Sequence, residues 1–240
     1  MKKKIKKIGK IILYILISII ILLFLNYISV FLVHPEDGGD WAIGQGIKAE
    51  NKIQNNEVEI KNFRNFNWIS KSKAERNYKN IKFDLNEIED VDLVVSRWND
   101  FKPMAHTFLI FNLKNNQKIG LSIESRRHSG DSFNTFDGFF YHYNLIYVWA
   151  SQRDLFQIRK IKKEQLSIYK LKLSKEDVKK MFLNYLKRTN EIKEKPEYYH
   201  VFWKNCANLL LDEMNDEYQD KIPFWVKSFA PGYLAKKIVH

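Results

Sequence analysis

The run MAHTFLIFNLKNNQKIGLSIESRR, residues 104–127, contains two apolar stretches separated by a short polar segment. Residues 104–112 and 118–127 have the aliphatic and aromatic composition of buried strands. The polar residues between them, 114–117, have the composition of a hairpin turn. We therefore predict two antiparallel strands that belong to a central sheet.

The register of this hairpin determines which side chains face each other. A turn of three residues, 114–116, pairs residue 113 with residue 117 and sets His106 opposite Glu124. Facing residues have Cβ atoms roughly 4.5–5.5 Å apart, so these two side chains would be neighbours. A turn with an even number of residues puts Glu124 on the other face of the sheet. The sequence leaves both registers open.

Other segments with strand or helix patterns lie on both sides of the hairpin. Strand patterns occur at residues 52–68, 91–98, 139–150 and 166–173. Residues 174–191 form a predicted helix with Ser174 as its N-cap and a stripe of apolar side chains along one face. A second helix is predicted to begin near Asn205 or Cys206. These elements predict one α+β domain with a central antiparallel sheet.

The composition excludes several classes of protein. With 45% apolar residues among 240, the chain has enough material for a packed core and is not a disordered protein. The net charge is +12, but six lysines in the first ten residues carry half of it, so the high charge is weak evidence for nucleic-acid binding. The single cysteine excludes an internal disulfide and a zinc site of several thiolates, and we expect no metal and no cofactor.

The N-terminal lysines are followed by an uncharged apolar run at residues 11–33. A helix needs roughly 20 apolar residues to cross a bilayer, so this run predicts an uncleaved signal anchor rather than a buried core helix. The lysines should hold the N-terminus in the cytoplasm. We therefore expect a cytoplasmic basic segment (1–10), a transmembrane anchor (11–33), a linker (34–50) and an extracytoplasmic catalytic domain (51–240), in a single-pass protein of the inner (cytoplasmic) membrane.

The lone cysteine, Cys206, is a nucleophile, an intermolecular link or an inert buried thiol. The segment WKNCANL, residues 203–209, makes Asn205 a plausible N-cap and puts Cys206 in the first turn of a helix. Helix N-termini stabilise thiolates, so the pKa of Cys206 is expected to fall below about 8.5. The same N–H groups would stabilise an oxyanion, which favours the nucleophile.

A cysteine nucleophile needs a base that is held by a third group. His106 lies within a predicted strand, which fixes the direction of its imidazole, and Glu124 is the candidate that would orient it. The alternative is a hydrogen-bonded histidine with a purely structural role. Arg126, Arg127 and Arg153 are candidates for binding an anionic headgroup, or equally for ion pairs.

Five short motifs together resemble a known family. They are Arg64-Asn65-Phe66, Ala105-His106-Thr107, the segment SIESRR at residues 122–127, Gln152-Arg153-Asp154 and Asn205-Cys206. Over residues 40–215 the chain resembles the Lnb-type N-terminal periplasmic domain of bacteria. The order of histidine before Asn-Cys is also similar to permuted papain-like folds of the NlpC/P60 and lecithin–retinol acyltransferase kind.

The resemblance implies a permuted papain-like fold with Cys206 as nucleophile and His106 as base. It further implies a thiol acyltransferase that moves an acyl chain from a membrane phospholipid to an amine, such as the N-terminus of a bacterial lipoprotein, through a thioester at Cys206. Glu124 would orient His106, and Arg126, Arg127, Arg153 and Asn205 would contact substrate. Two alternatives remain: a cysteine peptidase or amidase acting on peptidoglycan peptides, and a membrane-anchored binding module without catalysis.

Overall fold

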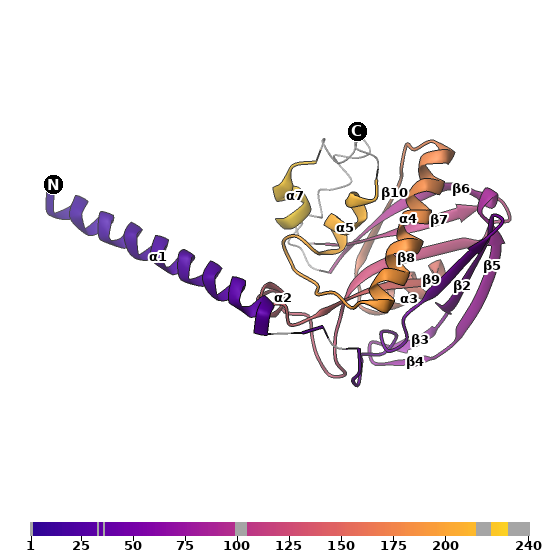
Figure 1. Cartoon of the computed structure of the whole chain (residues 1–240), viewed down its shortest axis with the longest axis horizontal. Helices are drawn as coiled ribbons and strands as arrows, with labels where there is room; N and C mark the ends of the chain where they lie inside the picture. Colours follow the sequence, from indigo (N-terminus) through magenta and orange to yellow (C-terminus); the bar gives the residue numbers. More distant parts are fainter. Residues whose placement is uncertain (1, 33, 36, 99–104, 215–221, 230–240) are drawn as a thin grey trace.

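The computed structural model describes residues 2–32, 34–35, 37–98, 105–214 and 222–229 (Figure 1). Within them, the main sheet has eight strands in the order β1-β2-β9-β8-β7-β6-β10, with β5 also paired to β2, and β3 and β4 form a separate small hairpin. The strands are β1 (Glu50–Gln54), β2 (Glu57–Arg64), β3 (Asn67–Ser70), β4 (Lys73–Glu75), β5 (Tyr78–Asp84), β6 (Ile88–Arg97), β7 (His106–Leu113), β8 (Lys118–Arg126), β9 (Asn144–Ser151) and β10 (Gln165–Lys170). All pairings in the main sheet are antiparallel except the short parallel contact of β2 with β9.

The central hairpin of β7 and β8 has the register with a three-residue turn. Leu109 pairs with Leu121 and Asn112 with Lys118, and the Leu113 N–H donates to the Gln117 carbonyl oxygen at 3.0 Å. Asn116 has a φ of +63°, a left-handed conformation that asparagine tolerates better than most residues. Of the two registers left open by the sequence, the odd one is therefore correct.

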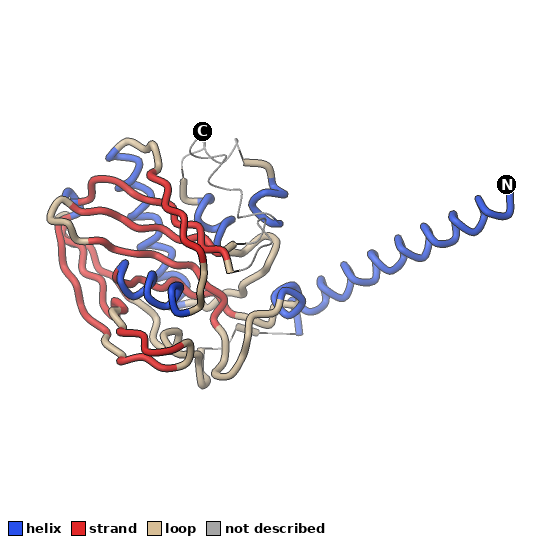
Figure 2. Tube along the Cα trace, turned by 180° about the vertical axis from the view of Figure 1, so that it is seen from behind, coloured by secondary structure: helices blue, strands red, loops and turns tan. Residues whose placement is uncertain are grey.

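Helices cover both faces of the sheet (Figures 1 and 2). Helices α4 (Lys175–Glu194) and α5 (Cys206–Asp212) lie on one face, and α3 (Gln152–Ile161) lies on the other. On the α4 side, the rings of Phe111 and Phe182 meet edge to face with centroids 4.8 Å apart, and both side chains are fully buried. Burial of side chains of this size contributes about 1.5–3 kcal/mol each. The remaining helical elements are η1 (Leu85–Glu87), α2 (Thr135–Phe139) and α7 (Phe224–Phe229).

Helix α1 (Lys2–Leu32) extends away from the domain as a separate rod (Figure 1). An 18-residue window within its portion Lys6–Leu32 has a mean hydropathy of 2.9, and this portion is long and apolar enough to cross a membrane. Most of its large apolar side chains are exposed, as they would be in lipid. Asn26 differs from them, because its side chain is buried and its amide donates to the Phe139 carbonyl oxygen at the end of α2.

The segment between the anchor and β1, predicted as a linker, packs against the domain. The Ala42 N–H donates to the Arg127 carbonyl oxygen at 2.8 Å, and the ring of Trp41 stacks on His128 with centroids 4.4 Å apart. Gln45 is only 3% exposed. The anchor is therefore followed by a short ordered segment.

One predicted strand begins later in the structure than expected, and one helix was not predicted. Residues 139–150 were expected to form one long strand, but Phe139 ends α2 and β9 begins only at Asn144. Asn134 caps α2 by accepting from the Phe136 N–H, and Tyr141 has a φ of +59°, which interrupts any extended run. Helix α3, which directly follows β9, was not predicted at all.

Candidate active site

A cavity of about 410 Å³ lies where β7 begins and β8 ends. Cys206 from α5 and His106 from β7 both line it, so the two groups predicted to carry the chemistry open into one space. Its remaining lining is a mixture of apolar and charged side chains: Gln45, Trp98, Ala105, Ile123, Glu124, Ser125, Arg127, Phe133, Thr135, Arg159, Lys162, Glu164, Tyr199, Val201, Phe202 and Asn205.

Cys206 is the first residue of α5, as predicted. The Asn205 side-chain oxygen accepts from the Ala207 and Asn208 N–H groups at 2.9 and 3.0 Å, which is the geometry of an N-cap. The thiol is 7% exposed. Burial raises the pKa of Cys206, and interactions with Thr107 only partly offset this effect. The expected fall in the thiol pKa was therefore wrong for this state, because desolvation outweighs the helix N-terminus.

His106 contacts Ser122 across the hairpin, with its Nε2 atom 2.8 Å from the Ser122 hydroxyl oxygen. That hydroxyl donates its one proton to Glu124 Oε1 at 2.8 Å. His106 must then donate from Nε2–H, and its Nδ1 atom carries the lone pair. Burial and the positive charge of Arg159 lower the pKa of His106 to about 3, so the imidazole is neutral at neutral pH.

Glu124 is linked to His106 through the Ser122 hydroxyl, whereas the sequence predicted the two side chains as direct neighbours. Arg159 donates to Glu124 Oε1 at 3.0 Å, and Gln45 donates to Oε2 at 3.1 Å. Burial alone would raise the pKa of Glu124, but the Arg159 guanidinium holds the pKa of this carboxyl well below its usual range. The carboxylate is therefore charged and fixed by three neighbours.

The thiol and the imidazole lie on opposite faces of the sheet. His106 shares a face with Phe108, whose ring centroid is 5.9 Å away, and that face is covered by α3. Thr107 points to the other face, where it interacts with Cys206. The cavity joins the two sides around the end of the strands. Among the hydrogen bonds of the described residues, none joins the Cys206 thiol to the His106 imidazole.

The four residues predicted to bind substrate fall into two groups. Arg127 and Asn205 line the cavity. Arg126 does not, because it donates to the carbonyl oxygens of Gln45 and Gly46 at 2.9 and 3.0 Å and its guanidinium lies 3.9 Å from the Trp41 ring centre. It fixes the segment after the anchor.

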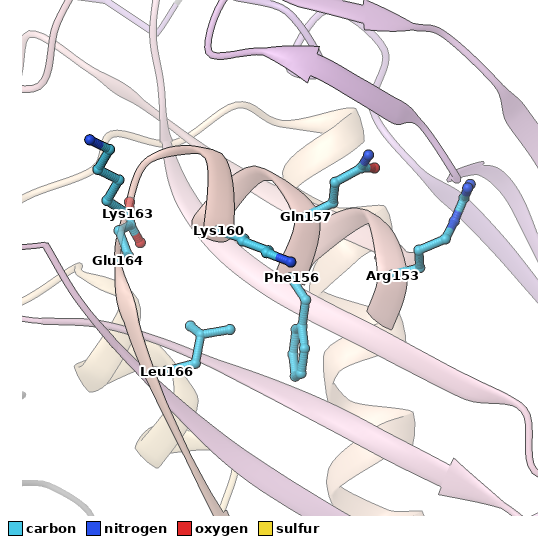
Figure 3. Close-up of a pocket in the computed structure, with 7 residues that line it drawn as sticks. All are labelled: Arg153, Phe156, Gln157, Lys160, Lys163, Glu164 and Leu166. Atoms are coloured by element: carbon cyan, nitrogen blue, oxygen red, sulfur yellow. The ribbon is translucent and has the colours of Figure 1, made fainter.

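Arg153 also lies outside the cavity. It donates to the carbonyl oxygen of Asn65 at 3.3 Å and borders an open groove on the outer side of α3. Figure 3 shows it at one end of this helix, with Phe156 and Leu166 below. The buried carboxylate next to it, Asp154, pairs with Arg64 at 2.9 Å instead. The structure thus separates Arg153 from Cys206.

Several residues of the site were not predicted. Ser122 lies two positions before Glu124 and so shares its face of the strand, a signal that the sequence contains. Gln45 and Lys162 come from a predicted linker and from the end of an unpredicted helix, and no sequence pattern indicates them. Three other histidines of the domain, His128, His142 and His200, lie outside the cavity lining. The described residues contain no cluster of histidine, cysteine and carboxylate side chains fit to hold a metal.

Comparison with known proteins gives one clear match. The family model of the Lnb N-terminal periplasmic domain matches residues 74–232, which include His106, Glu124 and Cys206. No curated protein and no solved structure matches the chain. Together with the apolar helix α1, the match indicates a membrane-anchored protein with an extracytoplasmic domain. Because the match covers well over half of the sequence, the chain belongs to the family of the Lnb N-terminal periplasmic domain.

Proposed function

We propose that this protein is a membrane-anchored thiol acyltransferase, which takes an acyl chain from a phospholipid and passes it to an amine through a thioester at Cys206. The observation that carries this proposal is the common cavity of Cys206 and His106. A thiol, a neutral imidazole and an orienting carboxylate are the groups that covalent acyl transfer requires.

The wall of the cavity beside the thiol supports an acyl substrate. Ala105, Ile123, Phe133, Val201 and Phe202 give it an apolar surface of the kind that a hydrocarbon chain can occupy. A narrow polar cleft would instead favour cleavage of peptidoglycan peptides. The lining therefore supports the transferase over the amidase.

In the proposed first step, the Cys206 sulfur attacks an ester carbonyl carbon while its proton passes to His106 Nδ1. The tetrahedral intermediate collapses to a thioester, and the imidazolium gives that proton to the departing lysophospholipid alkoxide. In the second step, an amine attacks the thioester and loses a proton to His106, which returns it to the sulfur. Substrate binding would have to bring the thiol and imidazole into hydrogen-bond distance, since such contacts often tighten only in the complex.

Two further groups would stabilise charge during this reaction. The Asn205 cap occupies the N–H groups of Ala207 and Asn208, which leaves the N–H of Cys206 as the donor for the oxyanion. The buried Nε atom of Arg127 has no hydrogen-bond partner among the described residues, and Arg127 lines the cavity together with Lys162. These two cations are suited to an anionic headgroup.

The proposal also includes a fold type and an orientation in the membrane. A helix with cysteine at its start, packed against an antiparallel sheet with histidine at a strand start, is consistent with a permuted papain-like fold. The N-terminal lysines favour a cytoplasmic N-terminus in the cytoplasmic membrane, which gives the domain access to lipoproteins as acceptors.

One observation favours a second function, an anchored binding module. Burial raises the pKa of Cys206, and a protonated thiol without a bond to an imidazole is the state expected of an inert cysteine. Alkylation of the native protein separates the two functions, because rapid labelling of Cys206 in the presence of lipid supports the enzyme and complete resistance supports the binding module.

The decisive experiment is intact-protein mass spectrometry after incubation with phospholipid vesicles. We expect a mass gain of one acyl chain on the wild-type protein and none on Cys206→Ala. His106→Gln should reduce the rate of acylation strongly. Arg153→Ala, outside the cavity, serves as the matched control for Arg127→Ala and should acylate normally. An acyl adduct that persists in Cys206→Ala would refute the thioester.

A further inference from the structure

We propose that the domain touches the membrane through a second surface besides its anchor. This surface consists of residues 133–141, which include α2, and of the turn at residues 200–204. It lies in the headgroup region of the leaflet on the domain's side. We call its exposed and half-buried rings the aromatic rim: Phe133, Phe136, Phe140, Tyr141 and Trp203. The inference concerns contact with lipid and does not depend on the chemistry at Cys206.

The hydrogen bond between Asn26 and Phe139 fixes the height of α2 relative to the anchor. Asn26 is buried although its neighbours along α1 are exposed, and its amide donates to the carbonyl oxygen at the end of α2. A polar side chain in a membrane helix is costly unless it finds such a partner. The contact therefore holds α2 at the level of Asn26.

That level is within or at the edge of the bilayer. From Lys10, the last charged residue before the apolar run, the helix rises about 24 Å to Asn26, at 1.5 Å per residue. The hydrocarbon core is about 30 Å thick. Tyr27 and Phe31 follow immediately, both more than 60% exposed, with ring centroids 5.2 Å apart. Aromatic side chains concentrate at the membrane interface, so these rings mark that boundary.

The aromatic rim has the composition of an interfacial surface. Phe136 is 63% exposed, Trp203 44% and Phe133 39%, and exposed apolar side chains that gather in one patch are typical of an interaction surface. The members also hold together, since the rings of Phe136 and Phe140 lie 4.8 Å apart and the Trp203 indole N–H donates to the Tyr141 hydroxyl at 3.4 Å. Figure 1 shows α2 directly beside the domain end of α1.

The position of the aromatic rim has a consequence for access to the cavity. Phe133 belongs to both the rim and the cavity lining, and Thr135, the first residue of α2, lines the cavity as well. The entrance on this side would therefore open toward lipid rather than toward water. Under the proposed function, a lipid substrate would enter laterally from the leaflet.

Depth-dependent quenching tests the proposal on the full chain in phosphatidylcholine vesicles. Phe136→Cys, labelled with an environment-sensitive fluorophore in a Cys206→Ser background, should be quenched by lipids with a spin label near the headgroup. Ile69→Cys is the matched control, because Ile69 is similarly exposed, at 54%, but lies on β3 (Figure 1). We expect several-fold stronger quenching by labelled lipid at position 136 than at position 69, and the reverse order with aqueous iodide.

Equal accessibility of positions 136 and 69 to iodide, with no quenching by labelled lipid, would overturn the proposal. Trp203→Cys provides a second probe in case the change at position 136 disturbs α2, and circular dichroism confirms that each variant is folded. Every probe whose variant is folded must report lipid contact for the proposal to stand. Because no readout involves acyl transfer, this result is independent of the proposed function.

Discussion

At the scale of single residues, the Glu124 carboxylate is the centre of the hydrogen-bond network around His106. Glu124 accepts from Ser122, which contacts His106, and from Arg159. The side chains of Glu124 and Arg159 are 16% and 9% exposed, so their charges are poorly screened by water. Removal of the Glu124 charge leaves the Arg159 guanidinium buried with only the longer contact of its Nε atom to Glu164 Oε2, at 3.7 Å.

Glu124→Gln should therefore destabilise the domain by about 3 kcal/mol, which urea unfolding can measure. Glu57→Gln is the control, because it breaks the exposed ion pair of Glu57 with Lys82 and should cost less than about 1 kcal/mol. Similar losses in the two variants would contradict a structural role for the carboxylate of Glu124.

The stability of the domain should also depend on pH through His106. Burial lowers the pKa of His106 from 6.5 to about 3, so the unfolded chain binds a proton that the folded chain does not. The contribution of His106 to the free energy of unfolding is fully present above about pH 6.5. It declines as the pH falls below this value, by at most about 1.4 kcal/mol per pH unit. His106→Gln should flatten the curve between about pH 7 and about pH 5 in denaturant titrations. Parallel curves for the two proteins would show that His106 is not held neutral.

At the scale of secondary structure, the sequence predicts elements whose signals are local. The hairpin of β7 and β8 and helix α4 follow from apolar patterns and from the Ser174 cap, which accepts from the Asp177 N–H. Helix α3 was missed because its 10 residues make fewer than three turns, which is too short for a clear apolar stripe. Its Asp154 is explained by Arg64, 90 positions away. The choice between Arg64 and Arg153 as partner of Asp154 depends on tertiary packing, which no local pattern contains.

The same limit applies to the site. His106, Cys206 and the Asn205 cap were predictable, because strand and helix signals place them. The face that each occupies was not: the alternation of β7 directs Thr107, rather than His106, toward the thiol. The pKa of Cys206 depends on its burial, which results from the packing of α5 against the sheet.

The cap of α5 allows a test of how this element controls the thiol. Asn205→Ala should cost about 1 kcal/mol and loosen the first turn, so that Cys206 reacts faster with an alkylating reagent. Ser174→Ala removes the equivalent cap of α4 and should cost a similar amount without any change at Cys206. Equal alkylation rates in both variants would show that the cap does not shield the thiol.

At the scale of the whole molecule, helix α1 and the domain are joined by a side-chain contact as well as by the chain itself. The Asn26 amide is the polar contact by which the apolar helix holds α2. Asn26→Leu keeps the span apolar but removes this contact. We expect faster hydrogen exchange in α2 and unchanged exchange in β7 and β8.

Ser18→Leu is the control for this variant. Ser18 lies two turns before Asn26 on the same apolar helix, so its replacement should leave hydrogen exchange in α2 unchanged. Wild-type exchange in Asn26→Leu would show that the anchor and α2 are not mechanically coupled.

Gln45 connects the segment after α1 with the cavity that Cys206 and His106 line. Its amide group bridges Glu124 and the backbone N–H of Arg127, and its carbonyl oxygen accepts from Arg126. Proteolytic release of the domain between residue 46 and β1 would therefore take away a piece of the pocket wall and strip a buried guanidinium of its acceptors. The released fragment would lack part of the cavity wall and two of the hydrogen-bond acceptors of Arg126, so the segment after α1 is an integral part of the folded domain.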